Sequence, residues 1–305
     1  MMRLVLSLGL LGGAAALLYS QTLWAPKGQP AVYKAPHKPH TKLKSLLAKH
    51  AGKTDWREVV VDDNHLASEY VMAKPGSAVR RAMHPDTRAW WVVMDGEVTF
   101  DIEGTGKVVG RKGSIIQVPM QTFFSYEVTG SKPALFFETN IARAKTLYES
   151  DTAPPRMPGL DWIPVKFNNR VVGRFDFNNK AHTTFDEVAE KLEKGELKGT
   201  IRIVQDARGT ANFIYGYNSK LPPLDEKNKG HYHPEGAEYW LILKGQIRYP
   251  IEKVGVVIAE EGDVVYVPPF TWHSPRWWGD GASCRLAMNG YPDISHLFED
   301  TRGTH

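Results

Sequence analysis

The two halves of this 305-residue chain repeat one pattern at a constant offset of 149 positions. The repeat is carried in the same order by His84-Pro85 and His233-Pro234, Trp91 and Trp240, Gly96 and Gly245, Gly113 and Gly262, and Val118-Pro119 and Val267-Pro268. The two turn glycines are 17 positions apart in both halves, so no insertion separates the copies. A shared register of this kind predicts that one structural unit was duplicated.

Each half has the composition pattern of an all-β domain. Short runs of β-branched and aromatic residues, broken by Gly, Pro, Asn and Asp, fill residues 56–141 and 199–288. This pattern predicts antiparallel strands in a sandwich or closed jelly roll. A short amphipathic helix is expected at residues 41–50, and a capping box at residues 184–187 begins another. The predicted fold is therefore all-β, with two tandem jelly-roll barrels that each follow a short helix.

The chain length fits this division, because a typical domain has about 100 to 200 residues. Prolines 154, 155, 158 and 164 indicate a connection between the halves. The predicted parts are a signal peptide or N-terminal anchor (1–20), a linker (21–40), a first barrel (41–150), a proline-rich linker (151–164) and a second barrel (165–305).

The first 20 residues are typical of an export signal. Arg3 precedes an apolar run over residues 4–18, and small or polar residues follow it. Because the run is near the short limit for crossing a bilayer, a cleaved signal peptide and an uncleaved anchor remain alternatives. Both place the folded protein outside the cytoplasm, either secreted or periplasmic.

Charge and cysteine content exclude several other classes. The formal net charge is +4, which is too small and too scattered to indicate nucleic-acid binding. The single Cys284 can form neither an intrachain disulfide nor a dithiol site. The expected partner is a small-molecule ligand or substrate, and a homo-oligomer is left open.

A set of metal-ligand residues occurs in the second half alone. His231 and His233 share one side of an extended strand, so both imidazoles can reach one ion. Glu238 precedes an apolar run, and His273 follows a Pro-Pro pair. Three imidazoles and one carboxylate can hold a divalent transition metal and leave positions open for water, oxygen or a small ligand. The residues do not distinguish Fe, Mn, Zn, Ni and Cu.

The first half has lost this set. At the offset of 149, His231, Glu238 and His273 correspond to Ala82, Ala89 and Phe124, and His84 alone remains. One imidazole does not hold a metal ion. We therefore expect one metal site per chain, in the second barrel, and a first barrel that is either structural or an emptied pocket.

These residues resemble the two sequence motifs of the cupin family. The first motif, a His-x-His and a Glu ahead of a glycine turn, is matched by His231, His233, Glu238 and Gly245. The second motif, a Gly, a Pro and a later His, is matched by Gly262, Pro268 and His273. Asp225, Phe270 and Trp277 depart from common residues of the family, but none of them is a ligand. The resemblance implies a two-domain cupin with a metal site in the C-terminal domain only.

Three further residues are candidates for substrate binding: Tyr215, Arg248 and Trp272. Arg248 could hold an anionic group through two hydrogen bonds, or it could be an outward-facing strand arginine. Strand parity alone does not decide between these alternatives. The other histidines, His296 among them, have no ligand-like neighbours in the sequence and are expected to be exposed or structural. No catalytic residue is predicted.

The resemblance leaves the function open, because this fold hosts oxygenases, decarboxylases, isomerases and binding proteins. We expect a metal-dependent oxidoreductase of the dioxygenase kind that acts on a small organic or carboxylate substrate. The alternatives are a non-catalytic metal- or ligand-binding cupin and a cupin decarboxylase or isomerase. Two-barrel aromatic-ring dioxygenases commonly keep their site in the front half with histidines only, whereas this site lies in the rear half and includes Glu238.

Overall fold

The computed structural model describes residues 25–152, 158–159 and 161–299. No helix within these ranges is long and apolar enough to cross a membrane. The predicted export segment, residues 1–20, lies outside the described residues, so its role stays a prediction.

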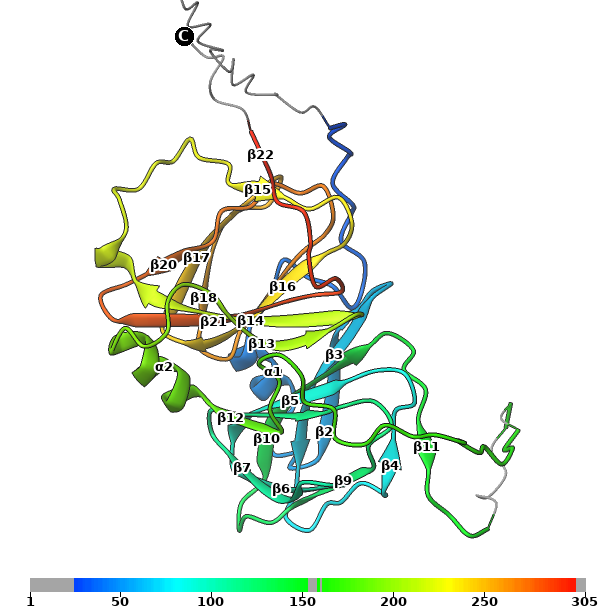
Figure 1. The fold of residues 1–305 in the computed structure, drawn as a ribbon. Helices are drawn as coiled ribbons and strands as arrows, with labels where there is room; N and C mark the ends of the chain where they lie inside the picture. Colours follow the sequence, from blue (N-terminus) through cyan, green and yellow to red (C-terminus); the bar gives the residue numbers. More distant parts are fainter. Residues whose placement is uncertain (1–24, 153–157, 160, 300–305) are drawn as a thin grey trace, which may run out of the picture.

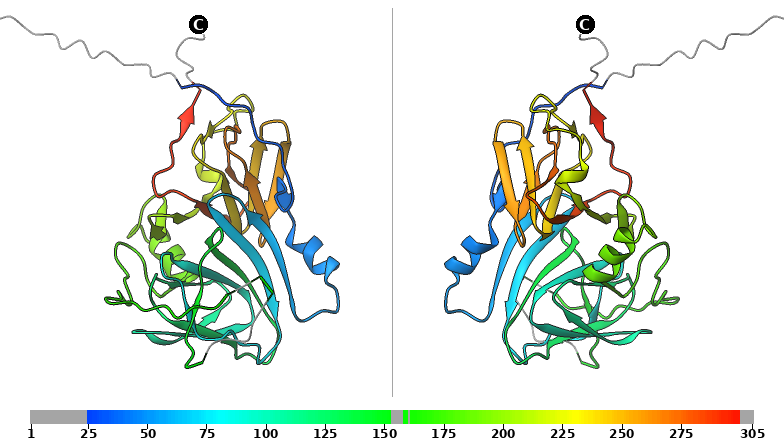
Figure 2. Two further views of the ribbon diagram at one scale, coloured as in Figure 1. Left: turned by 90° about the vertical axis from the view of Figure 1, so that its right-hand side faces the viewer. Right: turned by 90° about the vertical axis from the view of Figure 1, so that its left-hand side faces the viewer.

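Two β-barrels make up the fold, with the second stacked on the first (Figures 1 and 2). The strands of the first barrel are β2 (Trp56–Asp62), β3 (Leu66–Ala73), β4 (Ala82–Met83), β5 (Ala89–Asp95), β6 (Glu97–Ile102), β7 (Gly106–Arg111), β8 (Ser114–Val118), β9 (Phe124–Val128), β10 (Ala134–Ile141) and β11 (Leu147–Tyr148). They form two sheets, ordered β8-β5-β10-β3-β2 and β11-β4-β9-β6-β7.

The second barrel repeats this plan. Its strands are β13 (Ile201–Asp206), β14 (Gly209–Tyr217), β15 (His231–Tyr232), β16 (Glu238–Lys244), β17 (Gln246–Ile251), β18 (Gly255–Glu260), β19 (Val264–Val267), β20 (Arg276–Trp278), β21 (Ala282–Asn289) and β22 (Leu297–Phe298), with a 3₁₀ turn η1 (Asn218–Lys220) after β14. The sheet orders are β19-β16-β21-β14-β13, β18-β17-β20 and β15-β22. The prediction of an all-β fold with two tandem barrels is confirmed.

The strand register preserves the offset of 149 residues. In the first barrel Trp91 pairs with Ile116, and in the second Trp240 pairs with Val265. Likewise Val98 pairs with Val128, and Ile247 pairs with Trp277. These pairs lie on different sheets of each barrel, so the sequence repeat reflects a repeat of the whole unit.

The helical arm ahead of each barrel pairs with the other barrel. The first arm consists of β1 (His40–Thr41) and α1 (Leu43–Lys49), and the second of β12 (His182–Thr184) and α2 (Phe185–Glu193). β1 pairs with β19 of the second barrel, and β12 pairs with β8 of the first barrel. The two helices therefore lie on opposite sides of the junction between the barrels (Figure 2).

Both predicted helices are present, and the start of α2 has a local explanation. At the N-cap of α2, the side-chain oxygen of Thr184 accepts a hydrogen bond from the backbone N–H of Glu187 at 3.1 Å. This is one half of the predicted capping box. Residues 25–39, within the range predicted as a linker, lie along the second barrel, where Tyr33 donates a hydrogen bond to the carbonyl of Tyr266.

Apolar side chains form three cores. One lies inside the first barrel and includes Trp91, Phe100, Phe124, Tyr126 and Phe136. One lies inside the second barrel and includes Trp240, Ile247, Tyr249, Ile251 and Val267. The third lies between the barrels, where Tyr70 and Phe137 meet Phe213, Tyr239 and Leu286. Because this third core is shared, we expect the two barrels to unfold together.

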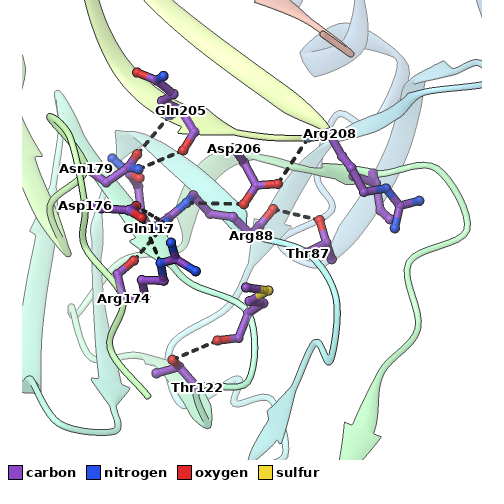
Figure 3. A network of polar contacts seen from close by, with 12 residues as sticks. Thr87, Arg88, Gln117, Thr122, Arg174, Asp176, Asn179, Gln205, Asp206 and Arg208 are labelled. Carbon is purple, nitrogen blue, oxygen red and sulfur yellow. Dashed lines mark hydrogen bonds and ion pairs between the residues drawn. The ribbon is translucent and has the colours of Figure 1, made fainter. Parts of the chain in front are cut away.

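A polar network joins the barrels through the segment that connects them (Figure 3). Arg88 of the first barrel is buried, and it donates a hydrogen bond to the carbonyl of Arg174 at 2.9 Å. Its guanidinium also lies 3.9 Å from the carboxylate of Asp206 in the second barrel. Asn179 exchanges two hydrogen bonds with the backbone of Gln205. The described part of the connection beyond residue 170 is thereby fixed between the two barrels.

Candidate metal centre

The four predicted ligands converge at one end of the second barrel. His231 lies on β15, His233 just after it, Glu238 at the start of β16, and His273 in the loop ahead of β20. Each offers a ligand atom, and these atoms all lie within 4.8 Å of one another. His233, Glu238 and His273 are buried, and His231 is partly buried. The described residues hold no other group of three or more such side chains.

Backbone pairing explains why residues 42 positions apart meet. The N–H of His231 donates to the carbonyl of His273 at 3.1 Å, and the N–H of His273 donates to the carbonyl of His231 at 3.0 Å. In the first barrel the corresponding Ala82 and Phe124 form the same kind of pair. The fold therefore brings these two positions together in both barrels, and only the second barrel carries ligand side chains there.

Hydrogen bonds to backbone carbonyls orient two of the imidazoles. Nδ1 of His233 donates to the carbonyl of Ser295 at 2.7 Å, and Nδ1 of His273 donates to the carbonyl of Thr271 at 2.9 Å. A carbonyl can only accept, so both Nδ1 atoms carry hydrogen and both Nε2 atoms face the cluster. Nε2 of His273 is buried without a hydrogen bond, at 3.4 Å from the Glu238 carboxylate. A buried lone pair without a partner fits a metal ligand.

Burial and interactions within the cluster shift the pKa values of Glu238, His231 and His233. Burial opposes ionisation of Glu238, but the hydrogen bond with His233 and the nearby imidazole of His273 outweigh it and hold the pKa of Glu238 well below its usual range. Burial, reinforced by the charge of His273, lowers the pKa of His231 to about 3. Burial also disfavours the charged form of His233, yet its hydrogen bond to Glu238 at 3.0 Å raises its pKa. The carboxylate is thus ionised and ready to bind a cation.

Metal binding at this site is expected to release protons near neutral pH. The pKa of His233 is raised above its usual value of 6.5, so at pH 6.5 most metal-free molecules carry a second proton on this ring, at Nε2. An ion must displace the proton to bind Nε2. We expect titration calorimetry in buffers of different ionisation enthalpy to find proton release at pH 6.5 that declines as the pH rises to 8.5. Release that grows with pH would contradict this assignment.

The corresponding place in the first barrel is filled. His84 donates from Nδ1 to the carbonyl of Lys145 at 2.9 Å and accepts at Nε2 from the side chain of Asn140 at 3.1 Å. Its ring lies 5.6 Å from the ring of Phe124, which packs in the barrel core. Both nitrogens of His84 are therefore occupied, as expected of a structural histidine.

The structure places the three candidate substrate-binding residues outside the interior of the second barrel. Tyr215 pairs with Cys284 on the face toward the first barrel and donates to Glu193 of α2 at 2.6 Å. Arg248 is buried on the outer face of β17, where it donates to Glu226 at 2.6 Å. Trp272 packs against the ring of Tyr232, at 4.8 Å between centroids.

Strand alternation explains why Arg248 and Trp272 point away from the barrel interior. On β17 the interior positions are Ile247, Tyr249 and Ile251, so Arg248 faces outward. Trp272 precedes the inward-facing His273 and therefore points the other way. These three residues are not retained as pocket-lining residues. Aromatic residues that border the cluster include Trp240, whose ring lies 5.3 Å from that of His273, and Phe298, whose ring lies 5.4 Å from that of His231. Tyr249 packs on Trp240 at 4.9 Å.

His296 is a residue that the sequence did not connect with the site. Its ring centroid lies 4.7 Å from that of His231 and 4.6 Å from that of His233. Partial desolvation beside the cluster and the nearby charge of His233 lower the pKa of His296. Because β22 brings it there from the C-terminal end of the chain, no motif spacing around His231 could have indicated it.

Comparison with known proteins agrees with the two-barrel fold. The family model described as a cupin domain matches residues 69–140 and 219–288. No curated protein matched the sequence. One similar structure is a variant of the salicylate 1,2-dioxygenase from Pseudoaminobacter salicylatoxidans in complex with gentisate, at 13% identity over 86% of this chain and 85% of that chain, with a TM-score of 0.63.

A second similar structure is the Cupin 2 conserved barrel domain protein from Leptotrichia buccalis, at 12% identity over 87% of this chain and 98% of that chain, with a TM-score of 0.56. At these identities the likeness shows the fold. With a cupin domain matched in each half and the same fold in its structural neighbours, this chain belongs to the cupin superfamily as a two-domain member, a bicupin.

Proposed function

We propose that this bicupin is a metal-dependent oxidoreductase of the dioxygenase kind, with a small organic or carboxylate compound as its substrate. The observation that carries the proposal is the cluster of three histidines and one glutamate in the second barrel, with His273 Nε2 buried and unbonded. The fold is shared with a salicylate 1,2-dioxygenase, which makes an oxygen-using reaction the first one to test.

Different residues of the second barrel have different roles in this proposed function. A redox-active ion held by His231, His233, Glu238 and His273 would supply activation of oxygen and polarise a bound substrate. Glu238 contributes the negative charge that balances the ion. Trp240 and Tyr249 are almost fully buried beneath the cluster, so they exclude water from the inner side. The substrate would then approach from the end of the barrel where His296 lies.

Oxygen consumption by the metal-loaded protein tests this function. The purified chain would be loaded in turn with Fe, Mn, Zn, Ni or Cu and offered a panel of phenols, diketones and carboxylic acids that includes salicylate and gentisate. We expect oxygen uptake on at least one compound with a redox-active metal, and no uptake by His273→Ala. Tightly held zinc with no uptake on any compound would contradict an oxidoreductase.

A non-catalytic binding protein is the second candidate, because four protein ligands can complete a closed tetrahedral zinc site. The number of ligands around the bound ion separates the two. Two exchangeable waters on a six-coordinate ion favour catalysis, and a four-coordinate ion without water favours a structural or binding role. A cupin decarboxylase or isomerase would give turnover of a carboxylic acid without oxygen uptake.

We also propose that the protein is exported, on the basis of residues 1–20. N-terminal sequencing of the protein recovered from cells would distinguish a cleaved signal peptide from an anchor formed by residues 4–18. Recovery of the intact N-terminus in the cytoplasm would contradict export.

A further inference from the structure

The C-terminal segment, residues 290–299, is joined to the strand that carries His231. β22 lies beside β15 at one end of the second barrel (Figure 1). In this pairing Phe298 lies opposite His231, and Leu297 lies opposite Tyr232. The same segment supplies the carbonyl of Ser295 that accepts the Nδ1 hydrogen bond of His233. The backbone of the segment therefore contacts two of the four candidate ligands, and the ring of Phe298 lies 5.4 Å from that of His231.

The side chain of His296 adds a further contact, on the outer side of the cluster. The rings of His231, His233 and His296 form a triangle with centroid distances of 4.9, 4.7 and 4.6 Å. His273 also contacts His231 and His233, but it lies on the opposite side of this pair from His296, next to the buried Trp240. His296 is exposed to solvent, whereas His273 is buried. A molecule that enters from solvent therefore meets His296 before it reaches His273.

The hydrogen bonding of His296 fixes what its ring can offer. Nδ1 donates to the carbonyl of Ile294 at 3.1 Å, so Nε2 of the neutral ring is an acceptor. His296 is not one of the four residues whose ligand atoms lie within 4.8 Å of one another. It is placed to contact something bound at the site rather than to bind the ion.

The first barrel provides an internal comparison. There β11 pairs with β4 as β22 pairs with β15, and the carbonyl of Lys145 accepts from His84 as that of Ser295 accepts from His233. The residue in the place of His296 is Thr146, whose hydroxyl lies 3.5 Å from Nδ1 of His84. The segment thus folds against the barrel without a histidine. A histidine at this place accompanies the ligand set and is absent where that set has been lost.

We propose that His296 is a substrate-contacting residue, whose Nε2 accepts a hydrogen bond from a hydroxyl group of a small ligand on the outer side of the four-residue cluster. The ligand class is a phenol, enol or hydroxy acid, because each combines a hydroxyl donor with an oxygen that a metal ion can hold. The inference rests on the proposed metal-dependent function, and it names the group that the substrate must carry.

Cobalt(II) and 4-nitrocatechol provide a test that does not depend on turnover. The full chain is loaded with cobalt(II), whose visible spectrum reports its coordination, and 4-nitrocatechol is titrated by its own absorbance. The variants are His296→Ala, His296→Gln, which restores an acceptor oxygen, and Thr146→Ala, the matched change in the first barrel. Amide hydrogen exchange of residues 290–299 confirms that the segment stays docked in each variant.

We expect all variants to bind one cobalt ion per chain with the wild-type resting spectrum. The dissociation constant for 4-nitrocatechol should rise about fivefold or more in His296→Ala, recover partly in His296→Gln and stay unchanged in Thr146→Ala. Equal binding of 4-nitrocatechol by wild type and His296→Ala would overturn the inference and leave the metal site intact. A changed resting spectrum in His296→Ala would make His296 a direct ligand and overturn it too. Absence of bound cobalt in the wild type would overturn the proposed function itself.

Discussion

Replacement of His233 or Glu238 by alanine is expected to remove the bound metal from the purified protein. Both side chains belong to the cluster whose ligand atoms lie within 4.8 Å of one another. Glu238 is its sole carboxylate, so Glu238→Ala would leave three imidazoles around a dication without a balancing charge. Each variant keeps three of the four ligands, so its affinity should fall and the ion should be lost to a chelator that the wild-type protein withstands.

The matched control for this prediction is His84→Ala. His84 occupies the position of His233 in the first barrel, but its two nitrogens are bonded to Lys145 and Asn140. Elemental analysis should find about one metal ion per chain in wild type and in His84→Ala, and almost none in the other two variants. The thermal stability of wild type should also rise with added metal, whereas that of His233→Ala should not. Metal loss in His84→Ala would refute the assignment of one site to the second barrel.

The sequence predicted most of the cluster because its members lie in short motifs. His231 and His233 alternate along a strand, and the constant offset from Ala82, Ala89 and Phe124 showed which half had kept its ligands. The same offset predicted two all-β units, and the strand register confirms it. Information that is local in the chain, or repeated within it, could be read without a structure.

Contacts between distant segments could not be read in this way. β1 and β12 are two and three residues long, and no hydrophobic pattern of that length indicates which barrel a strand will join. His296 reaches the site through β22, which follows a turn outside both motifs. Arg248 shows a third limit, because its side chain faces outward and is nevertheless buried, and its contact with the loop residue Glu226 could not be read from strand parity.

Replacement of Asp263 by alanine is expected to cost about 3 to 5 kcal/mol of the free energy of unfolding, since it removes a buried carboxylate and leaves three partly buried donors without this partner. The carboxylate of Asp263 is 8% exposed and accepts hydrogen bonds from His40 at 2.7 Å, from the N–H of Leu43 at 3.0 Å and from the N–H of Glu260 at 3.1 Å. Two of these donors lie on the arm formed by β1 and α1. The variant should therefore release the first arm from the second barrel.

The first barrel again offers the matched control. Ser114 is the counterpart of Asp263, and its hydroxyl contacts His182 of the second arm at 2.9 Å and the N–H of Arg111 at 3.0 Å. Ser114→Ala should cost about 1 to 2 kcal/mol, because it removes fewer hydrogen bonds and no charge. Asp263→Asn, which keeps one acceptor oxygen, should fall between the two alanine variants. Urea denaturation of the metal-free proteins, followed by tryptophan fluorescence, gives all three values.

The amount of bound metal distinguishes a loss of stability in Asp263→Ala from damage to the metal site. β19 begins beside Asp263 and ends at Val267, which pairs with Glu238, so the arm and the metal cluster lie at opposite ends of one strand. Asp263→Ala should therefore bind metal stoichiometrically under conditions where it is folded. A decrease of less than about 1 kcal/mol in the free energy of unfolding would mean that the shared apolar core holds the first arm in place. A loss of several kcal/mol in the free energy of unfolding would show that the polar contacts of the first arm with the second barrel help to hold the two barrels together.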